Sequence, residues 1–421
     1  MICACDKNAK WNHHVKITTD EGERLYSFDH IHKNDQYNIF FYTTNSNNKV
    51  IDNIDKNGKY LKPNIKKSKT EDDRFFPNIF NIDVFDENSK IRKNIFKKQA
   101  EGESKAWVSD NLNSFYFAVR TNIIYEMQVV DDYIQNSNTL TEYEIYKSKD
   151  FGKTIYQLSN WSKHDEISDI FFFQDATRGY ILGSNRTIWK TLNGGESWHK
   201  IALPKDIHVL KEPEGVYNEK GLFTKANFPN DFFYESACFD KQTGKLVIVT
   251  FDHLSSNTTQ GISKIYTLDW SEERFDYTQV KANFTLDNQL ITHLVYHPKL
   301  GYVFISLVDD FSNNGYMSVP TYVSKIDLQS QLNQQLLGSK LYIRHLFLSD
   351  NLTLYTSGTN DPYSSYASYN EISFISNDLG GNWKKEKEMN ENGMLLLQGF
   401  DKSKGRLWTN LDTQVYSRNI D

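Results

Sequence analysis

The sequence predicts an all-β protein whose four-stranded units repeat around a common axis, as in a β-propeller. A turn of the form Ser/Thr-x-Asp/Asn-x-Gly-x-x-Trp occurs at residues 148–155, 191–198 and 376–383, with isoleucine closing the first copy. The second copy begins 43 residues after the first, and the third begins 185 residues later, close to four further intervals. One propeller blade takes about 40–45 residues. Aromatic residues make up 14% of the chain against only 8 prolines, which favours strands.

Each residue of this repeated turn has a physical role. The short Asp or Asn side chain bonds to nearby backbone amides, and the glycine two places later takes positive φ without a Cβ clash. The closing Trp or Ile starts the next strand and packs inward. We therefore expect a structural role, away from the binding rim, for Ser148, Asp150, Gly152, Asn193, Gly195, Trp198, Asp378, Gly380 and Trp383.

Residues 167–202 form the clearest four-stranded unit, because apolar runs alternate there with turn residues. Its predicted strands are 167–174, 179–183, 187–191 and 198–202. First-strand, turn and second-strand patterns recur at 239–246, 296–302, 348–352 and 400–407. Third strands are predicted at 263–269, 322–328 and 371–376.

An earlier unit takes strands at 106–108, 115–119 and 143–147, and the segment 23–66 is a weaker candidate for another. Residues 67–100 fit no unit. The total is seven blades, or six without 23–66. The last unit has three strands, ending at 415–417, and residues 14–18 are expected to supply the fourth. Pairing of the two ends would close the ring and remove exposed sheet edges. The expected organisation is a flexible terminus at 1–13 and one propeller domain at 14–421.

Composition excludes several classes of function. The net charge is −6 and no basic run is longer than Lys66-Lys67, so nucleic acid is not an expected partner. Three cysteines make no disulfide framework and no CxxC-type metal spacing. No apolar run reaches 18 residues, which argues against a transmembrane helix. P-loop, GxSxG and HExxH patterns are absent, so we expect neither a cofactor nor these chemistries.

The stretch Ile2-Cys3-Ala4-Cys5 has the form of the end of a bacterial lipoprotein signal. On this interpretation Cys5 is lipidated, residues 1–13 form a tether, and the protein is periplasmic or in the cell envelope. The other interpretation is a chance match at the start of a cytoplasmic chain.

The three turns resemble Asp-boxes, the BNR-repeat motif of sialidase-like propellers. Residues 178–204, RGYILGSNRTIWKTLNGGESWHKIALP, are similar to a repeat of photosystem II assembly-factor-like bacterial propellers. The resemblance implies a propeller fold. It does not select a function, because such proteins include hydrolases, sorting receptors, assembly factors and binding modules.

Long connections are expected on the rim opposite the repeated turns, at 121–141, 203–231, 252–260, 309–320 and 358–370. Long loops grouped on one rim indicate that this rim carries the function. Two of these loops combine aromatic and acidic residues, a composition typical of protein-recognition surfaces. The alternative is that their tyrosines pack on the scaffold. The candidate binding residues are Asp309, Asp310, Phe311, Tyr316, Asp361, Tyr363, Tyr366 and Tyr369.

The favoured function is a non-catalytic, monomeric, protein-binding propeller, either an exported assembly-factor-like protein or a toxin-inhibiting immunity protein. No catalytic residue is assigned. The alternative is a carbohydrate-binding or glycoside-hydrolysing propeller. The Arg-Ile-Pro string typical of sialidases is absent, although Arg120, Arg186 and Arg344 would support an enzyme if they clustered. An inverting glycanase needs two carboxylates about 6.5–9.5 Å apart, and candidates are Asp131, Asp132, Asp309, Asp310 and Asp361.

Two further patterns have simple interpretations. His30 and His32 lie on one face of a predicted strand, but without a third ligand they are expected to be surface histidines rather than a metal pair. Cys238 lies in a predicted first strand and is expected to be a buried core thiol.

Overall fold

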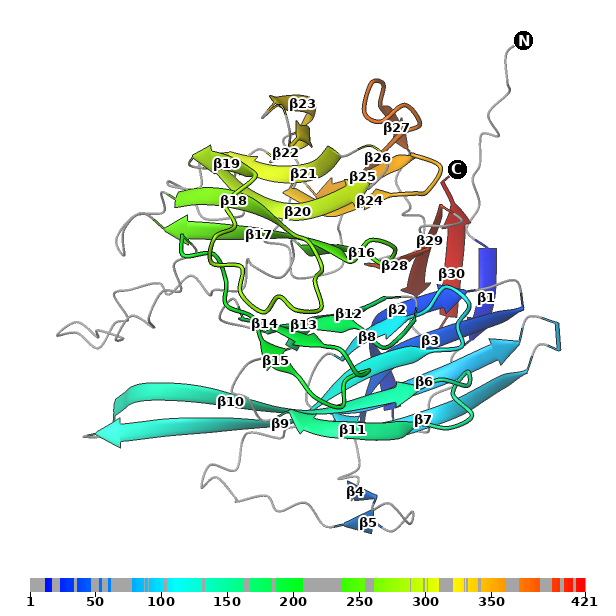
Figure 1. Cartoon of the computed structure of the whole chain (residues 1–421). Helices are drawn as coiled ribbons and strands as arrows, with labels where there is room; N and C mark the ends of the chain where they lie inside the picture. Colours follow the sequence, from blue (N-terminus) through cyan, green and yellow to red (C-terminus); the bar gives the residue numbers. More distant parts are fainter. Residues whose placement is uncertain are drawn as a thin grey trace.

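A computed structural model places the chain in one all-β propeller, and the residues it describes contain no helix. In the described part of the chain, seven four-stranded antiparallel sheets follow one another (Figure 1). No helix in this described part is long and apolar enough to cross a membrane. The description covers the strands and most tight turns. Outside it lie 1–11, 17–22, 47–52, 55–59, 62–77, 207–236, 254–260, 310–320, 360–370, 387–395 and shorter runs elsewhere.

The first three sheets occupy the N-terminal half of the chain. The first contains β2 (Glu23–Lys33), β3 (Tyr37–Ser46), β6 (Asn78–Asp86) and β7 (Arg92–Ala100). The second contains β8 (Lys105–Val108), β9 (Phe115–Val130), β10 (Tyr133–Ser148) and β11 (Tyr156–Trp161). The third contains β12 (Ile167–Phe172), β13 (Gly179–Gly183), β14 (Thr187–Thr191) and β15 (His199–Lys200). A separate ribbon pairs β4 (Asn53–Ile54) with β5 (Tyr60–Leu61).

Four sheets complete the ring. The fourth contains β16 (Ala237–Asp240), β17 (Lys245–His253), β18 (Gly261–Leu268) and β19 (Phe284–Asp287). The fifth contains β20 (Gln289–His297), β21 (Tyr302–Asp309), β22 (Thr321–Asp327) and β23 (Leu332–Ser339). The sixth contains β24 (Tyr342–Leu348), β25 (Leu354–Thr359), β26 (Glu371–Ser376) and β27 (Lys384–Glu386). The seventh contains β28 (Leu396–Asp401), β29 (Arg406–Leu411), β30 (Gln414–Asn419) and β1 (Asn12–Lys16).

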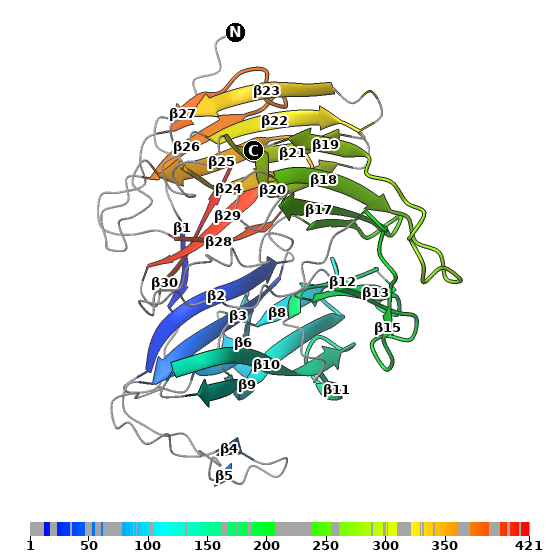
Figure 2. The same cartoon turned by 90° about the vertical axis from the view of Figure 1, so that its left-hand side faces the viewer.

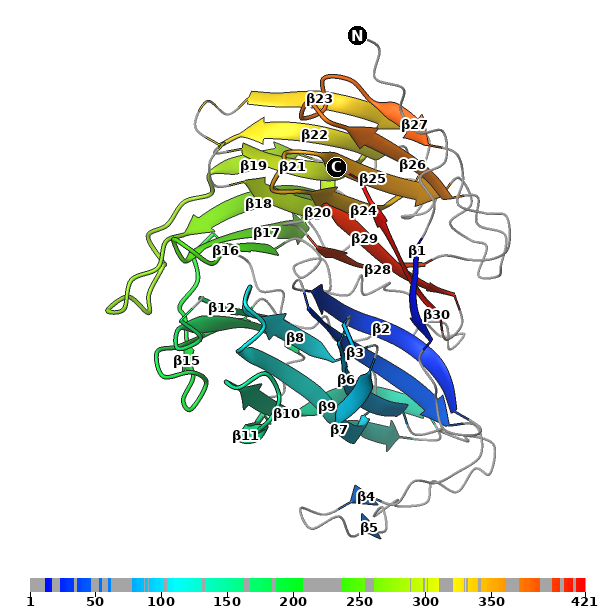
Figure 3. The same ribbon diagram turned by 90° about the vertical axis from the view of Figure 1, so that its right-hand side faces the viewer.

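The two ends of the chain close the ring within the seventh sheet. β1 pairs antiparallel with β30, as the sequence predicted, although the strand begins at Asn12 rather than at residue 14. Figures 2 and 3 show the seventh sheet between the first and the sixth, with β28 beside β2. First strands of successive sheets also meet at β2–β8, β8–β12, β16–β20 and β20–β24. The first strand of each sheet therefore lies nearest the common axis.

This strand order gives the molecule two different rims. In an antiparallel sheet that runs outward from its first strand, the first and third turns lie at one end. The second connection and the link to the next sheet lie at the other end. We call the first end the turn rim and the second the loop rim. All three repeated turns join third to fourth strands, so they lie on the turn rim.

Two sequence expectations need correction. Residues 67–100, which fitted no unit, include β6 and β7, the outer strands of the first sheet. The 31-residue connection between β3 and β6 hid them, because the spacing rule expected the third strand much earlier. Residues 121–141, expected as a loop, instead extend β9 and β10 into a paired hairpin, with Tyr133 opposite Val130 (Figure 1).

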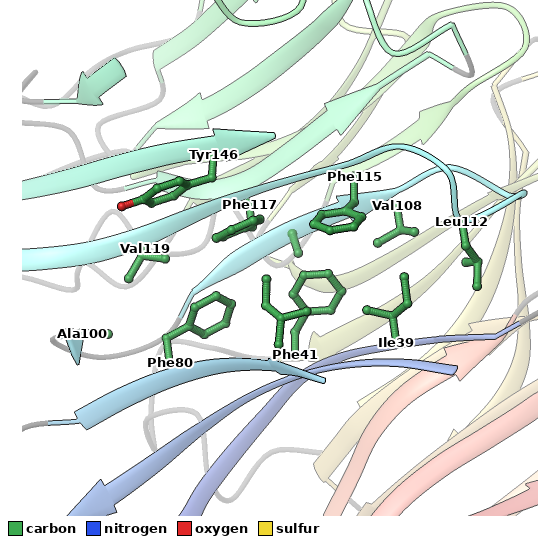
Figure 4. Packing of buried hydrophobic residues seen from close by; sticks show 12 residues of the cluster. Ile39, Phe41, Phe80, Ala100, Val108, Leu112, Phe115, Phe117, Val119 and Tyr146 are labelled. Carbon is green, nitrogen blue, oxygen red and sulfur yellow. The ribbon is translucent and has the colours of Figure 1, made fainter. Parts of the chain in front are cut away.

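Apolar side chains fill the spaces between neighbouring sheets. Between the first and second sheets, Phe41 and Phe80 meet Phe115, Phe117 and Tyr146 (Figure 4). The Phe117 ring stacks on Tyr146 at 5.1 Å and meets Phe96 edge-on at 4.9 Å. Similar clusters join the second to the third sheet and the third to the fourth. Because packing is distributed over these interfaces, each sheet is stabilised mainly by its two neighbours.

A buried ionic network lies in the first sheet, on the side of β6 that points away from this aromatic cluster. The Asp83 side chain has no exposed surface and pairs with the guanidinium of Arg92, whose side chain is 20% exposed. Tyr42 donates to the Asp83 carboxylate at 3.0 Å, and the Asn94 amide donates to it at 2.7 Å. Burial and the neighbouring carboxylate raise the pKa of Tyr42, so its hydroxyl remains a donor. Arg92, Tyr42 and Asn94 together offset the free-energy cost of removing the Asp83 carboxylate from water.

Candidate functional site

The turn rim is held by the same hydrogen bonds in each repeated turn. In the first copy, Ser148 Oγ accepts from the Gly152 amide at 2.8 Å and donates to Asp150 Oδ1 at 3.0 Å. Asp150 in turn accepts from the Thr154 amide at 2.9 Å. The equivalent bonds in the other two turns are 2.7–3.0 Å long. In the second turn they join Thr191, Asn193, Gly195 and Ser197. In the third turn they join Ser376, Asp378, Gly380 and Asn382.

Backbone geometry explains the glycine of this turn. φ is +76° at Gly152 and +90° at Gly380, in the left-handed region. A Cβ at Gly380 would also lie 2.4 Å from Leu336 Cδ1. Positive φ and this steric overlap therefore both disfavour a residue with a side chain at this position. The closing residues pack against the cores between sheets, and each stands immediately before a fourth strand. They are Ile155, Trp198 and Trp383.

We expect Ser376→Ala to lower the free energy of unfolding by about 1–3 kcal/mol, because buried amides lose their acceptor. Ser376 is 1% exposed and accepts from the amides of Gly380 and Asp378.

Bonds from Asn382 and Ser376 lower the pKa of Asp378 to about 2. The contribution of Asp378 is therefore complete above pH 4 and is lost as the pH falls towards 2. Chemical denaturation at pH 7 and pH 3 measures both effects. Equal stability of Ser376→Ala and the wild type would contradict this role.

The loop rim carries the long connections. Second-to-third-strand connections there include 254–260, 310–320 and 360–370, and the extended β9–β10 hairpin projects from the same rim. Apart from the connection 269–283 between β18 and β19, the described turn-rim connections are at most seven residues long. Several are closed by backbone hydrogen bonds, such as Gly244 to Asp240 at 2.7 Å. The two rims therefore differ in the way expected of a scaffold face and a recognition face.

Most of the predicted binding residues lie outside the described part of the chain. Asp309 is the last residue of β21, paired with Gln289 at the loop-rim end of the fifth sheet. The others fall in 310–320 and 360–370, and the structure places none of their side chains: Asp310, Phe311, Tyr316, Asp361, Tyr363, Tyr366 and Tyr369. Cys5, Asp131, Asp132 and Arg186 also lie outside it. Of the arginines proposed as a cluster, Arg120 lies on β9 and Arg344 on β24, in sheets that are not neighbours.

The structure shows a cationic and aromatic cluster on the turn rim that the sequence did not indicate. Lys190 has no exposed surface. Its ammonium lies 4.0 Å from the centre of the Trp270 ring and donates to the carbonyls of Ser271 and Arg274. Burial lowers the pKa of Lys190 to about 8, although Glu272 opposes the effect. The cluster joins the third and fourth sheets, and its saturated contacts indicate a structural role.

A second unexpected feature lies on the inner strands. Asp169 follows a bulge in β12 and sits near Lys105 of β8. Desolvation raises the pKa of Asp169 to about 6, while Lys105 and the Ile170 amide lower it. A carboxyl of this kind changes charge close to neutral pH, a property common at functional sites.

The described side chains contain no group of three or more His, Cys, Asp and Glu residues placed to hold a metal. His30 and His32 lie on β2, and their side chains are outside the description. Cys238 lies on β16 as predicted, but it is partly rather than fully buried. Its thiol donates to the Leu294 carbonyl at 3.0 Å and packs against the core between the fourth and fifth sheets. That setting is typical of a packing cysteine.

The chain is similar to solved propeller structures over 81–100% of its length. YCF48 bound to D1 peptide matches with a TM-score of 0.51 and 9% identity over 100% of both chains. The propeller domain of the Trilobed protease from Pyrococcus furiosus has a TM-score of 0.49 and 10% identity, over 94% of this chain and 96% of that one. The GH74 enzyme of Niastella koreensis has a TM-score of 0.47 and 10% identity, over 81% of this chain and 50% of that one. No family model and no curated protein matches. The likeness to YCF48, whose TM-score is above 0.5, supports the propeller fold.

Proposed function

We propose that the chain is a non-catalytic, protein-binding propeller whose seven sheets are seven blades and whose loop rim is the recognition face. The observation that carries the proposal is the difference between the rims. Described turns on one rim, including the longer connection 269–283, are closed by internal hydrogen bonds. The connections 254–260, 310–320 and 360–370 and the β9–β10 hairpin share the other rim. Loops of this kind on a rigid scaffold are the usual place for binding residues.

The composition of two loop-rim connections, 310–320 and 360–370, supports a protein ligand. Residues 310–320 and 360–370 contain five aromatic residues, four of them tyrosine. Tyrosine supplies a large contact area at low entropic cost. The solved protein with the same fold, YCF48, holds a D1 peptide, so this architecture is compatible with peptide recognition.

The repeated turns support the assignment of an Asp-box propeller, with a scaffold role for the motif. Their side chains are occupied in holding the turn, as in the three bonds made by Ser376. The proposed setting is the bacterial cell envelope, through lipidation at Cys5, with an assembly-factor-like or toxin-inhibiting role. Detection of a lipid on Cys5 by mass spectrometry of the native protein tests this setting, and an unmodified terminus recovered from the cytoplasm would overturn it.

An affinity pull-down from a native cell envelope tests the proposed function. Three variants each alter one loop-rim element: a Gly-Ser replacement of 310–319, one of 360–369, and removal of 122–141 from the hairpin. A matched control replaces exposed Lys153 on the turn rim with glutamine. We expect one stoichiometric protein to be retained by the intact chain and the control and lost by at least one loop-rim variant.

Other outcomes of this experiment would contradict the proposal. If the Lys153→Gln control also fails to retain the partner, recognition would not be specific to the loop rim. Retention on a glycan array without any protein partner would favour the carbohydrate-binding or hydrolysing alternative. In that case Asp309, Asp310 and Asp361 become the residues to replace first.

A further inference from the structure

The hairpin of β9 and β10 extends far beyond the other two strands of its sheet. Both strands contain 16 residues, whereas the flanking strands β8 and β11 contain 4 and 6. β8 pairs with β9 only at 115–118, and β11 pairs with β10 only at 143–147. The outer part of the hairpin, in which 122–130 pairs with 133–142, therefore continues as a ribbon of two strands (Figure 1).

One side of this ribbon has no strand beside it among those that the structure describes. Residues 122–130 pair with β10 on one side, and no described strand pairs with them on the other. We call this second side of 122–130 the outer β9 edge. It lies beyond the loop rim, because β9 runs from the turn rim to the loop rim. An edge of this kind presents a row of backbone N–H and C=O groups to which another extended chain can bond, and at about 3.4 Å per residue it is about 30 Å long.

Register and composition favour the β9 side of the ribbon over the β10 side. The pairs from Asn122 to Val130 follow one another without interruption on β9, whereas β10 carries a bulge at Gln135. A bulge bends its strand and disturbs pairing along it. The β9 segment reads Asn-Ile-Ile-Tyr-Glu-Met-Gln-Val-Val, which is rich in residues that favour strands, while 135–139 of β10 reads Gln-Asn-Ser-Asn-Thr. The β9 side is therefore the better template for a further strand.

The hairpin lacks the residue types that usually protect an exposed strand. Natural edge strands are commonly guarded by lysine or proline, which discourage pairing with another chain. Residues 122–141 contain no lysine, arginine, histidine or proline. By contrast β7, the outermost strand of the first sheet, has lysine at three positions, Lys93, Lys97 and Lys98. Since a two-stranded ribbon is at best marginally stable in water, a third strand would stabilise the hairpin.

Charge indicates which kind of strand the outer β9 edge would accept. The acidic residues of this part of the hairpin are Glu126, Asp131 and Asp132, and no basic residue balances them. Opposite charges on facing strands stabilise a sheet, and like charges directly opposite each other destabilise it. A second copy of β9, paired antiparallel in full register, would place Glu126 opposite Glu126 of the copy, because this residue is the centre of 122–130. The complementary occupant is therefore a basic segment of another protein.

We propose that the outer β9 edge binds an extended, basic segment of the partner protein by strand addition. Backbone hydrogen bonds join the segment to 122–130, as in other complexes in which a peptide adds a strand to a sheet. Lysine or arginine side chains of the segment complement the charge of Glu126. This mode of binding rests on the protein-binding function proposed above, and it adds the surface and the chemistry of the partner.

Binding of a short peptide of alternating lysine and valine to the full chain tests the outer β9 edge. A peptide of alternating lysine and proline has the same charge, but proline lacks the N–H that a strand ladder needs. A peptide of alternating glutamate and valine reverses the charge. Fluorescence anisotropy measures each affinity. We expect the lysine-valine peptide to bind about tenfold more tightly than either of the others, because it alone combines strand pairing with the complementary charge.

Two matched variants locate the binding site. Glu126→Lys should weaken binding of the lysine-valine peptide by about tenfold, because an attractive cross-strand pair becomes repulsive. Glu273→Lys makes the same change of charge at an exposed residue of the turn rim and should leave the affinity unchanged. Hydrogen exchange adds a measurement of backbone pairing. Since residues along an antiparallel strand alternate in the edge to which they bond, alternate amides of 122–130 should exchange more slowly when the peptide is bound.

Several outcomes would overturn strand addition at this edge. They are absence of peptide binding, equal binding of the lysine-proline peptide, and equal affinities of Glu126→Lys and Glu273→Lys while circular dichroism shows both folded. A dimer of the intact chain that is lost on removal of 122–141 would show that a second copy, and not a basic partner, covers the edge. A protein captured from the cell envelope that is still retained after this removal would support the protein-binding function and refute the outer β9 edge as its site.

Discussion

Replacing Arg92 with leucine is expected to lower the free energy of unfolding by about 3 kcal/mol, near the lower end of the 3–5 kcal/mol range for breaking a buried ion pair. Asp83 is fully buried, and Arg92 is its cationic partner. Without the guanidinium, Tyr42 and Asn94 still donate to the carboxylate, but no positive charge compensates it. Urea denaturation at pH 7 measures the loss.

A second substitution tests the cause of this loss. In the Arg92→Leu background, Asp83→Asn should restore part of the stability, because an amide needs no compensating charge and still accepts from Tyr42. Arg92→Lys is the matched variant that keeps the charge and removes the planar donor group, and it should fall between wild type and leucine. Equal stability of all four proteins would show that the ion pair contributes nothing.

The residues involved explain why this network could not be predicted. Asp83, in the string Asn-Ile-Asp-Val-Phe, has the alternating polar position of a strand with one solvent-facing side. In a propeller both faces of a sheet are covered by neighbours, so this polar position is buried and needs Tyr42, Arg92 and Asn94. Tyr42 and Arg92 are 50 residues apart, so a short window of sequence cannot predict that they meet.

Short apolar runs beside a repeated turn were the predictable part of the fold. The strands Gly179–Gly183, Thr187–Thr191 and Glu371–Ser376 match the expected bounds because glycine and Asp or Asn mark their ends. The β9–β10 hairpin was missed for the opposite reason. Its outer half includes Gln-Asn-Ser-Asn-Thr at 135–139, a composition more common in loops, yet cross-strand pairing makes it a ribbon.

Replacing Phe117 with alanine is expected to destabilise the protein by about 3–5 kcal/mol, the usual cost of removing a buried phenyl ring. Phe117 has no exposed surface and contacts rings from both the first and the second sheet, including Phe80 at 5.6 Å and Tyr146 at 5.1 Å (Figure 4). Phe117→Leu should cost less than half as much, because it leaves a smaller cavity. Tyr156→Ala, at a side chain 54% exposed, is the neutral control.

The part of the molecule that Phe117→Ala destabilises is as informative as the size of the stability loss. If each sheet is stabilised mainly by its neighbours, Phe117→Ala should accelerate hydrogen exchange first in β6 and β9, on the two sides of the cavity, and less in β21 across the ring. Uniform acceleration in all seven sheets would instead indicate that the propeller opens as a single cooperative unit. Protection unchanged in β6 and β9 would contradict the packing of Phe117 between the two sheets.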